Sequence, residues 1–177
     1  MEIHEELALI ARAKKGEQAA LGLLWDAITP KLYGYLVNTL REKSLADDIL
    51  QNTWLKAIAS LAKFHARGVR FSSWLFAIAR NECRQHWRQN GRERSIEETN
   101  EENFQTVSVG GDLSEKFLVE KILKMLPEED RELLRLRYIA DLPFKEIARV
   151  LEISVITARV RVHRSLARAR TGFNTIV

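Results

Sequence analysis

The sequence is poor in cysteine, proline and glycine. Its single cysteine, Cys83, excludes a disulfide within the chain. Only 3 prolines and 8 glycines occur among 177 residues, which leaves few of the residues that hairpin turns require. The commonest residues are instead Leu, Ala, Arg, Glu, Ile and Lys, most of which favour helices. We therefore expect an all-α protein.

Long apolar runs are also missing. No run approaches the roughly 20 residues that a membrane span needs. The amino terminus alternates charged with apolar residues, reading MEIHEELALIARAKKGE, and does not offer the apolar core of a signal peptide. Because 46% of the residues are hydrophobic, the chain can still build folded cores. We expect a cytoplasmic protein with no membrane insertion.

Motifs for catalysis and for metal binding are absent from the sequence. The four histidines lie in different segments, and Cys83 has no second cysteine to pair with. The sequence contains no glycine-rich phosphate loop, no HExxH motif and no CxxC motif. We therefore expect no catalytic residue, no metal and no cofactor, and we do not expect an enzyme.

Charge is distributed unevenly along the chain. The formal net charge is +4 and the isoelectric point is near 9.3. From Lys63 to Arg94 there are eight Lys or Arg against two Glu, and from Ser154 to Arg170 there are five Arg and no acid. Between these blocks, Ser95 to Glu115 carries six acids and no base. Two separate contacts with a polyanion would fit this pattern.

Apolar spacing of three and four residues predicts about four helices before residue 95. One predicted helical face comprises Leu50, Trp54, Ala57, Ile58 and Leu61, and a second comprises Trp74, Leu75, Ile78, Ala79, Cys83 and Trp87. Pro30 is expected to begin or to kink one of these helices. Residues 1–94 are therefore expected to form a small helical domain.

The segment from 95 to 112 has little helical periodicity, is acidic and ends in two glycines, so we expect a flexible linker. A second helical domain, residues 113–177, should begin with a helix to about Met125 and continue with another opening at Pro127. The acids at 128–130 would there complement the helix dipole. Two amphipathic helices then follow, Phe144 to Leu151 and a helix capped by Ser154, with a short turn between them. In the last helix Val155, Ala158, Val162 and Leu166 should share a face. This arrangement is typical of a helix-turn-helix.

The last helix has the clearest functional pattern. Its side chains outside the predicted core are Thr157, Arg159, Arg161, His163, Arg164, Arg168 and Arg170. The second helix of a helix-turn-helix enters the major groove, where arginine binds guanine edges and phosphates. The alternative interpretation is a solvated basic face on a terminal helix.

A second basic stripe, Arg80, Arg84 and Arg88, recurs every four residues beside Asn81 and Gln85 and could follow a DNA backbone. The preceding segment HARGVRFS offers charged and aromatic side chains suited to an unstacked base, namely Arg67, Arg70 and Phe71 beside Trp74. The alternative for Trp74 and Trp87, given their helical spacing, is a place in the core.

A polar patch on a mostly apolar segment is formed by Asp47, Asp48 and Gln51. On the residues alone, this acidic helix start is explained by compensation of the helix dipole.

Three segments, in this order, resemble the extracytoplasmic-function sigma factors, the smallest group of the sigma-70 family. The first is LADDILQNTWLKAI, residues 45–58, which resembles the family's polymerase-binding helix. The second is RFSSWLFAIARNECRQHWRQ, residues 70–89, which is similar to the segment that melts and reads the minus-ten element. The third, residues 126–170, resembles the domain that reads the minus-thirty-five element.

This resemblance implies a two-domain sigma factor that binds the beta and beta-prime subunits of core RNA polymerase and promoter DNA, and that is controlled by an anti-sigma factor. The implied polymerase contacts are Asp47, Asp48, Leu50, Gln51 and Trp54. Asn81 matches a position that helps to hold a flipped promoter base, with the loop at residues 65–72 forming the rest of the pocket. Positions facing the upstream element are implied for Arg137, Arg159, His163 and Arg164, with Ser154, Thr157 and Arg161 beside them. Such a factor would serve a stress or envelope regulon.

The sequence departs from the family at three positions of the helix-turn-helix. Glu152 occupies the turn position where the family usually has Gly, and Ile156 and Val160 replace what are commonly Gly and Ser. An alternative function is a stand-alone helix-turn-helix regulator whose amino-terminal half is a sensor or dimerisation domain.

Overall fold

The computed structural model describes residues 1–66, 68, 70–89 and 121–176. Every element of this part of the chain is a helix, as the all-α prediction requires. The chain divides into two compact units, Met1–Phe104 and Gln105–Val177. The predicted linker at 95–112 lies outside the described residues, as does most of the helix expected at 113–125, of which residues 121–124 are described and helical. The domain bounds 1–94 and 113–177 stay predictions.

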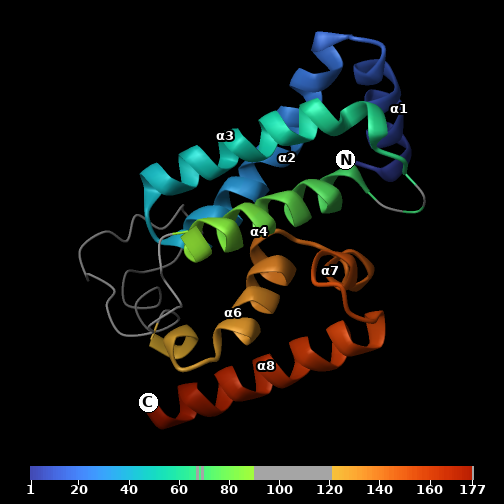
Figure 1. Cartoon of the computed structure of the whole chain (residues 1–177). Coiled ribbons are helices and arrows are strands. Elements are labelled where there is room, and N and C mark those ends of the chain that lie inside the picture. The colour runs from blue at the N-terminus through green and yellow to red at the C-terminus, as the bar shows by residue number, and fades with distance from the viewer. Residues whose placement is uncertain (67, 69, 90–120, 177) are drawn as a thin grey trace. The chain divides into compact units, whose positions relative to one another are not determined.

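The described residues of the first unit form four α-helices, as the apolar spacing predicts. They are α1 (Ile3–Lys14), α2 (Gln18–Leu40), α3 (Lys43–Ser60) and α4 (Phe71–Gln89), and the short helix η1 (Leu61–Lys63) follows α3. Figure 1 shows α3 and α4 side by side, and each of them also packs against α2. Because the chain reverses between them, the loop that joins α3 to α4 lies at one end of the pair.

Pro30 does not begin a helix. It lies inside α2, which is continuous from Gln18 to Leu40. A proline removes one helical hydrogen bond, but the buried side chains of Ile28 and Leu32 on either side of it hold both halves of α2 against the unit.

The core of the first unit is aliphatic and aromatic. Fully buried side chains include Leu24, Leu32 and Leu36 of α2, and Tyr35 packs edge-on against Phe76 with 5.6 Å between ring centroids. The two predicted core faces need correction, because Ile58 is 47% exposed and Trp74, Ile78 and Trp87 are only partly buried. Phe71 and Phe76 occupy the buried face of α4 instead. A stripe read at three-and-four spacing fixes the period of a helix but not the centre of its buried face.

The second unit forms the predicted helix-turn-helix. Its described elements are α6 (Glu128–Leu134), the π-helical segment η2 (Arg135–Ile139), α7 (Phe144–Val150) and α8 (Val155–Ile176). Ser154 caps α8 as predicted, since its Oγ accepts the Thr157 N–H at 3.0 Å. Glu152, in the turn between α7 and α8, has a φ of +57°, the left-handed conformation that a glycine adopts more easily.

Leu133, Leu136 and Ile147 form the core of this unit with Ala158 and Val162 of α8. The predicted core face of α8 is wrong at its two ends, because Val155 and Leu166 are 41% and 37% exposed. Ser165 and Gly172 are buried in their place. Small residues at these positions let α8 approach the other helices closely.

The acids at the start of α6 do more than complement a helix dipole. Glu128 lies 2.5 Å from Arg135 Nη1 and 3.0 Å from Arg131 Nε, and all three side chains are less than 15% exposed. The Arg131 Nε is not aligned for a hydrogen bond. Burial, and then the charge of Arg135, lower the pKa of Arg131. Glu128 therefore balances two buried guanidinium groups that repel one another.

We predict that Glu128→Gln destabilises the second unit by about 3 kcal/mol, because it removes the negative charge that lies against two buried guanidinium groups. The control is Glu129→Gln, which removes the same charge from the same helix turn at a side chain that is 80% exposed. All 4 tryptophans lie between residues 25 and 87, so their fluorescence reports the first unit. Urea unfolding followed by far-UV circular dichroism should shift for Glu128→Gln while the tryptophan transition stays in place. Equal stability of the two variants would contradict this role of Glu128.

Candidate functional site

The outward face of α3 is acidic at one end and apolar at the other. Asp47, Asp48 and Gln51 are exposed, as the prediction of a contact surface requires. Farther along the helix, Leu55 and Ile58 are 58% and 47% exposed. Sequence reasoning missed these two residues, since it assigned Ile58 to the core and did not single out Leu55. The signal was available: Leu55 is out of phase with Trp54, Ala57 and Leu61, which do lie in the core.

Two residues predicted to bind a partner from α3 are buried. Leu50 is 9% exposed and Trp54 is 2% exposed. Trp54 packs against Trp25 at 5.0 Å between ring centroids, and its Nε1 donates to Thr29 Oγ1 at 3.1 Å. The prediction that Leu50 and Trp54 contact another protein directly therefore needs correction. Both side chains hold α3 against its own unit.

Asp47 is held by a neighbouring helix. Burial raises the pKa of Tyr33, and the hydrogen bond and negative charge of Asp47 raise that pKa further. Tyr33 therefore stays protonated, and its hydroxyl donates a hydrogen bond to the Asp47 carboxylate. This contact restricts Asp47, while the Asp48 and Gln51 side chains stay exposed.

The loop between η1 and α4 is anchored at both ends by α1. At its start, Lys14 Nζ donates to the carbonyl oxygens of Phe64 and Ala62. At its end, the buried carboxylate of Glu6 accepts the Ser72 N–H at 3.1 Å and the Ser72 hydroxyl at 3.3 Å. A carboxylate at this position satisfies an N–H of the first turn of α4 and complements its dipole. The predicted base-binding loop therefore depends on a helix that sequence reasoning did not connect with it.

The aromatic side chains around this loop divide into a buried and an accessible set. Phe71 is 1% exposed and packs against Phe64 at 5.4 Å, so its predicted role as an open face for a base is wrong. Trp74 is partly exposed at the edge of the same cluster. Arg70 is half-buried, and Arg67 lies outside the described residues.

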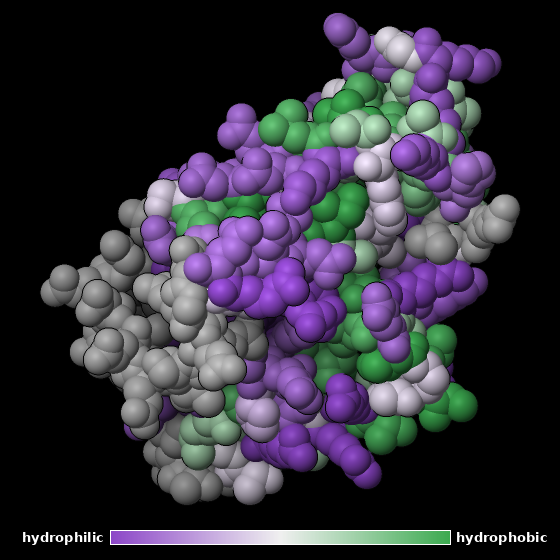
Figure 2. Space-filling model, viewed as in Figure 1, coloured by the Kyte–Doolittle hydropathy of each residue, from purple (hydrophilic) through white to green (hydrophobic). Residues whose placement is uncertain are grey.

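An exposed polar stripe follows the outward face of α4. Its members are Asn81, Arg84, Gln85 and Arg88, whereas Arg80 is partly buried and has an interaction of its own. Figure 2 shows hydrophilic side chains over α3 and α4, with hydrophobic surface visible between the two helices. The sequence prediction of a stripe repeating every four residues thus holds for Arg84 and Arg88, with Asn81 one turn earlier.

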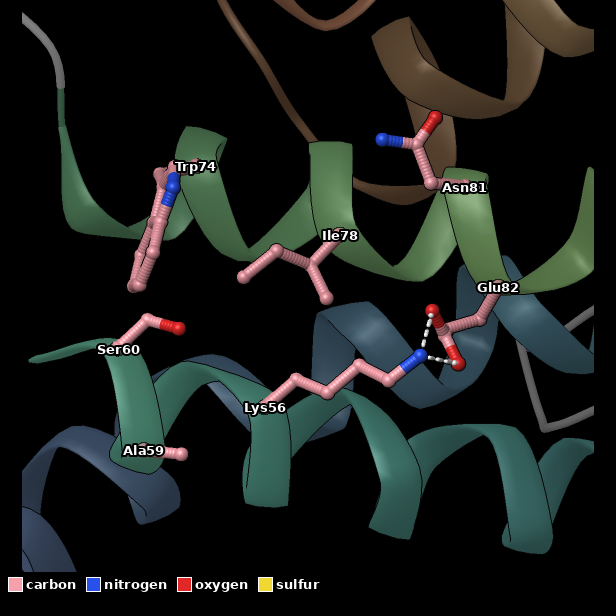
Figure 3. Close-up of a pocket in the computed structure, with 7 residues that line it drawn as sticks. All are labelled: Lys56, Ala59, Ser60, Trp74, Ile78, Asn81 and Glu82. Atoms are coloured by element: carbon pink, nitrogen blue, oxygen red, sulfur yellow. Dashed lines mark hydrogen bonds and ion pairs between the residues drawn. The ribbon is translucent and has the colours of Figure 1, made fainter.

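An open pocket of about 400 Å³ lies between α3 and α4. It is lined by Lys56, Ala59, Ser60, Trp74, Ile78, Asn81 and Glu82. Figure 3 shows Trp74 and Ile78 facing α3, while the Asn81 side chain points away from the Lys56–Glu82 ion pair that closes one end. Trp74 and Asn81 are seven residues apart, about 10 Å along α4, and their side chains point in different directions in Figure 3.

The basic residues of α8 point in two directions. Arg161 lies 3.7 Å from Glu129, and Arg168 pairs with Asp130, so both reach toward α6. Arg159 and His163 are exposed on the opposite side of the helix, and Arg164, about one turn from both Arg161 and Arg168, is exposed as well. Arg161 and Arg168 stay about half exposed, at 45% and 56%, and DNA contact by Arg161 stays a prediction. Ser154 and Thr157 are exposed but already share a hydrogen bond at 2.8 Å.

Two arginines, one before α7 and one on α8, lie over the ring of Phe144. Arg137 is half-buried, donates to the Leu142 carbonyl at 3.1 Å and lies 5.2 Å from the Phe144 ring centroid. Arg159 lies 5.6 Å from the same ring. Phe144 thus holds the guanidinium groups of Arg137 and Arg159 near one another, where one anion could bind both of them.

Comparison with known families matches both units. Residues 24–93 match the family described as Sigma-70 region 2, and residues 116–168 match Sigma-70, region 4. Among the residues that the structure describes, no helix is both long and apolar enough to cross a membrane.

Curated relatives extend over nearly the whole chain. The RNA polymerase sigma factor CarQ of Myxococcus xanthus is 31% identical, with 90% of this chain and 92% of CarQ covered. The ECF RNA polymerase sigma factor SigW of Bacillus subtilis is 30% identical over 88% of this chain and 89% of SigW. For BldN of Streptomyces coelicolor, also an ECF RNA polymerase sigma factor and 30% identical, the chain spans 64% of the relative's length.

Solved structures have the same fold. CnrH in complex with the cytosolic domain of CnrY superposes with a TM-score of 0.73 at 24% identity, covering 97% of this chain and 98% of that one. The sigma factor RpoE of Bartonella quintana, in complex with the anti-sigma factor NepR, gives a TM-score of 0.71 at 25% identity, covering 87% and 96%.

We predict that Glu6→Ala frees the end of the loop before α4. Amide hydrogen exchange at residues 70–73 should become at least ten-fold faster, because the Ser72 N–H loses its acceptor. Glu6→Gln is the matched control, since its side-chain carbonyl can still accept this N–H, and exchange should change much less. Equal exchange at residues 70–73 in Glu6→Ala and in the parent would contradict the anchoring role of α1.

Proposed function

This chain belongs to the sigma-70 family as an extracytoplasmic-function sigma factor, and we propose that it divides its work between the two units as follows. The first unit binds core RNA polymerase and opens the promoter, and the second holds duplex DNA upstream. The observation that carries this proposal is a pair of helix faces that are exposed in the described part of the chain, one acidic and apolar on α3 and one basic on α8. Phosphodiester chemistry belongs to the polymerase, and the chain itself acts as a non-enzymatic specificity factor in the cytoplasm.

Polymerase binding is assigned to the outward face of α3. Asp47, Asp48 and Gln51 supply hydrogen-bond acceptors for a basic partner surface, and Leu55 and Ile58 supply apolar area that becomes buried on binding. Exposed apolar side chains beside charged ones are typical of protein interfaces. In this proposal Leu50 and Trp54 act from beneath, by keeping α3 straight and fixed. The partner surface belongs to the beta and beta-prime subunits.

Promoter opening is assigned to the loop at 65–70 together with α4. Unstacking a base costs a few kcal/mol, which capture of the base in a pocket must offset. Trp74 offers a partly exposed ring, and Asn81 offers an amide that can pair with a base edge. Arg84 and Arg88 continue along the same face and can follow the phosphates of the separated strand. Arg67, Arg70 and Arg80 would supply further charge there.

Upstream recognition is assigned to α8. As the second helix of a helix-turn-helix it enters the major groove, with Arg159, His163 and Arg164 exposed toward the DNA. Arg137, which lies over the same Phe144 ring as Arg159, would bind a phosphate beside the helix. Ser154 and Thr157 at the start of the helix, and Arg161 farther along it, would add contacts with the DNA backbone.

Control by an anti-sigma factor is also proposed. CnrH was solved with the cytosolic domain of CnrY, and RpoE of Bartonella quintana was solved with the anti-sigma factor NepR. The uncovered α3 face suits a protein competitor of the polymerase, because blocking it would prevent core binding. A stress or envelope regulon would fit such control.

A stand-alone helix-turn-helix regulator is the other function that the second unit could serve. The match of residues 24–93 to Sigma-70 region 2 is not expected of a sensor or dimerisation domain, so this alternative is not favoured. The two functions differ in one observable property, stable binding to core polymerase without DNA.

We predict that Asp47→Ala, Asp48→Ala and Gln51→Ala together weaken binding to core polymerase by more than ten-fold. Each lost polar contact costs on the order of 1 kcal/mol, and ten-fold corresponds to about 1.4 kcal/mol. Fluorescence anisotropy of the labelled chain titrated with core polymerase measures this. The control, Asp26→Ala, removes an exposed carboxylate from α2 and should leave affinity unchanged. Unchanged affinity in the triple variant would reject the α3 assignment, and no binding by the parent would reject the sigma-factor function.

We also predict that replacing two basic residues of the helix-turn-helix changes DNA affinity in two different ways. Arg164→Ala should cost about 1–3 kcal/mol, with the loss concentrated at one promoter position, because the side chain reads a base edge. Lys145→Ala, on the exposed side of α7, should weaken all sequences equally and make the salt dependence shallower, because it contacts phosphate. Affinities for a set of single-base promoter variants at several salt concentrations separate these outcomes. A uniform loss for Arg164→Ala would identify it as a phosphate contact.

A further inference from the structure

The centre of the outward face of α8 is apolar. Ile156 is 77% exposed and Val160 is 44% exposed, and the two residues are one helical turn apart. They lie on the side of α8 opposite to Ala158 and Val162, whose side chains are buried in the core. Ile156 is the most exposed large hydrophobic side chain in the part of the chain that the structure describes.

Nothing in the fold of the unit requires these two residues. β-Branched side chains are slightly unfavourable in helices, so helix propensity does not account for them. Against the described residues of the second unit, the Ile156 side chain is 77% exposed and therefore gains little free energy from burial. Their role must therefore come from whatever molecule covers this face.

The surroundings indicate a polyanion. Arg159, His163 and Arg164 flank the apolar pair, and no acid occurs from Ser154 to Arg170. A protein partner that covered this face would have to balance these cations, whereas duplex DNA supplies phosphates at the rim of the groove and base edges at its centre. The apolar pair then faces the groove floor, where the thymine C5-methyl is the apolar group that bases present.

We propose that Ile156 and Val160 read thymine methyl groups in the upstream promoter element. This inference rests on the proposed function, in which α8 enters the major groove. Residues one turn apart are about 6 Å apart along the helix, and base pairs are stacked about 3.4 Å apart. The two side chains therefore reach methyl groups about two base-pair steps apart. Arginines beside them bind guanine edges or phosphates, so the element combines thymine with positions read by charge.

The experiment replaces thymine by deoxyuridine, which lacks only the C5-methyl group and keeps every hydrogen-bonding group of the base. Holoenzyme reconstituted from the full chain and core polymerase first selects its upstream element from a pool of random duplexes. Each thymine of that element is then replaced singly. Loss of one buried methyl should weaken binding about four-fold at one or two positions.

Three variants connect this loss with the residues. Ile156→Ala and Val160→Ala should bind thymine and deoxyuridine duplexes equally, each at its own position. Val155→Ala is the matched control, because Val155 is 41% exposed on the same helix but lies off the outward face, and it should keep the four-fold discrimination. Because Ile156 and Val160 are exposed, none of these truncations leaves a cavity in the core.

The outcomes separate the proposal from the function on which it rests. If the holoenzyme selects no upstream element, the proposed function fails. If it selects one but deoxyuridine is tolerated at every position, the function stands and methyl reading by α8 is wrong. If deoxyuridine weakens the parent and both alanine variants equally, another residue reads the methyl groups. If the alanine variants lose core polymerase affinity with unchanged DNA discrimination, the apolar pair belongs to a protein interface.

Discussion

The contact between Trp54 of α3 and Phe71 at the start of α4 joins the two helices on which the first unit's surfaces depend. Their ring centroids are 6.1 Å apart, and both side chains are almost fully buried. Trp54 turns one side of α3 inward, so that Asp48, Gln51 and Leu55 face outward. Phe71 fixes the first residue of α4, and with it the end of the loop that α1 anchors through Glu6. Polymerase binding and base capture, as proposed, are therefore attached to one rigid aromatic cluster.

In the second unit, some arginines are paired with acids of α6 and others are exposed on α8. Acids at the start of α6 engage the arginines nearest to them: Glu128 balances two buried guanidinium groups, and Asp130 pairs with Arg168. Of these pairs, the one between Asp130 and Arg168 draws a cation of α8 toward α6, off the surface that is proposed to bind DNA. The cations that stay on that surface surround Ile156 and Val160, so the proposed reader combines charge at its edges with apolar contact at its centre.

Much of this architecture could be predicted from the sequence. Helical periodicity gave the four helices of the first unit and the helix-turn-helix, and charge patterning gave the basic stripes of α4 and α8. Which side of a stripe is buried could not be predicted, because periodicity leaves the centre of a face undetermined by a residue or so. Periodicity correctly places Leu50 and Trp54 on the buried face of α3, but it also places Ile58 there although Ile58 is exposed. The surface roles of Leu50 and Trp54 come from the family resemblance, and that of Phe71 comes from the composition of its segment. Neither source indicates how deeply a side chain is buried. The links from Glu6 and Lys14 to the loop connect positions about 50 to 66 residues apart, and no local pattern reveals them.

The most direct test of the account is transcription from fragmented genomic DNA of the source bacterium by its purified core polymerase, with the 5′ ends of the transcripts mapped. Core polymerase alone should produce ends without a shared upstream sequence. Addition of the chain should produce a small set of ends preceded by two common elements about two helical turns apart. A chain that binds DNA fragments but yields no new 5′ ends, or only suppresses existing ones, would contradict the account and favour a stand-alone regulator.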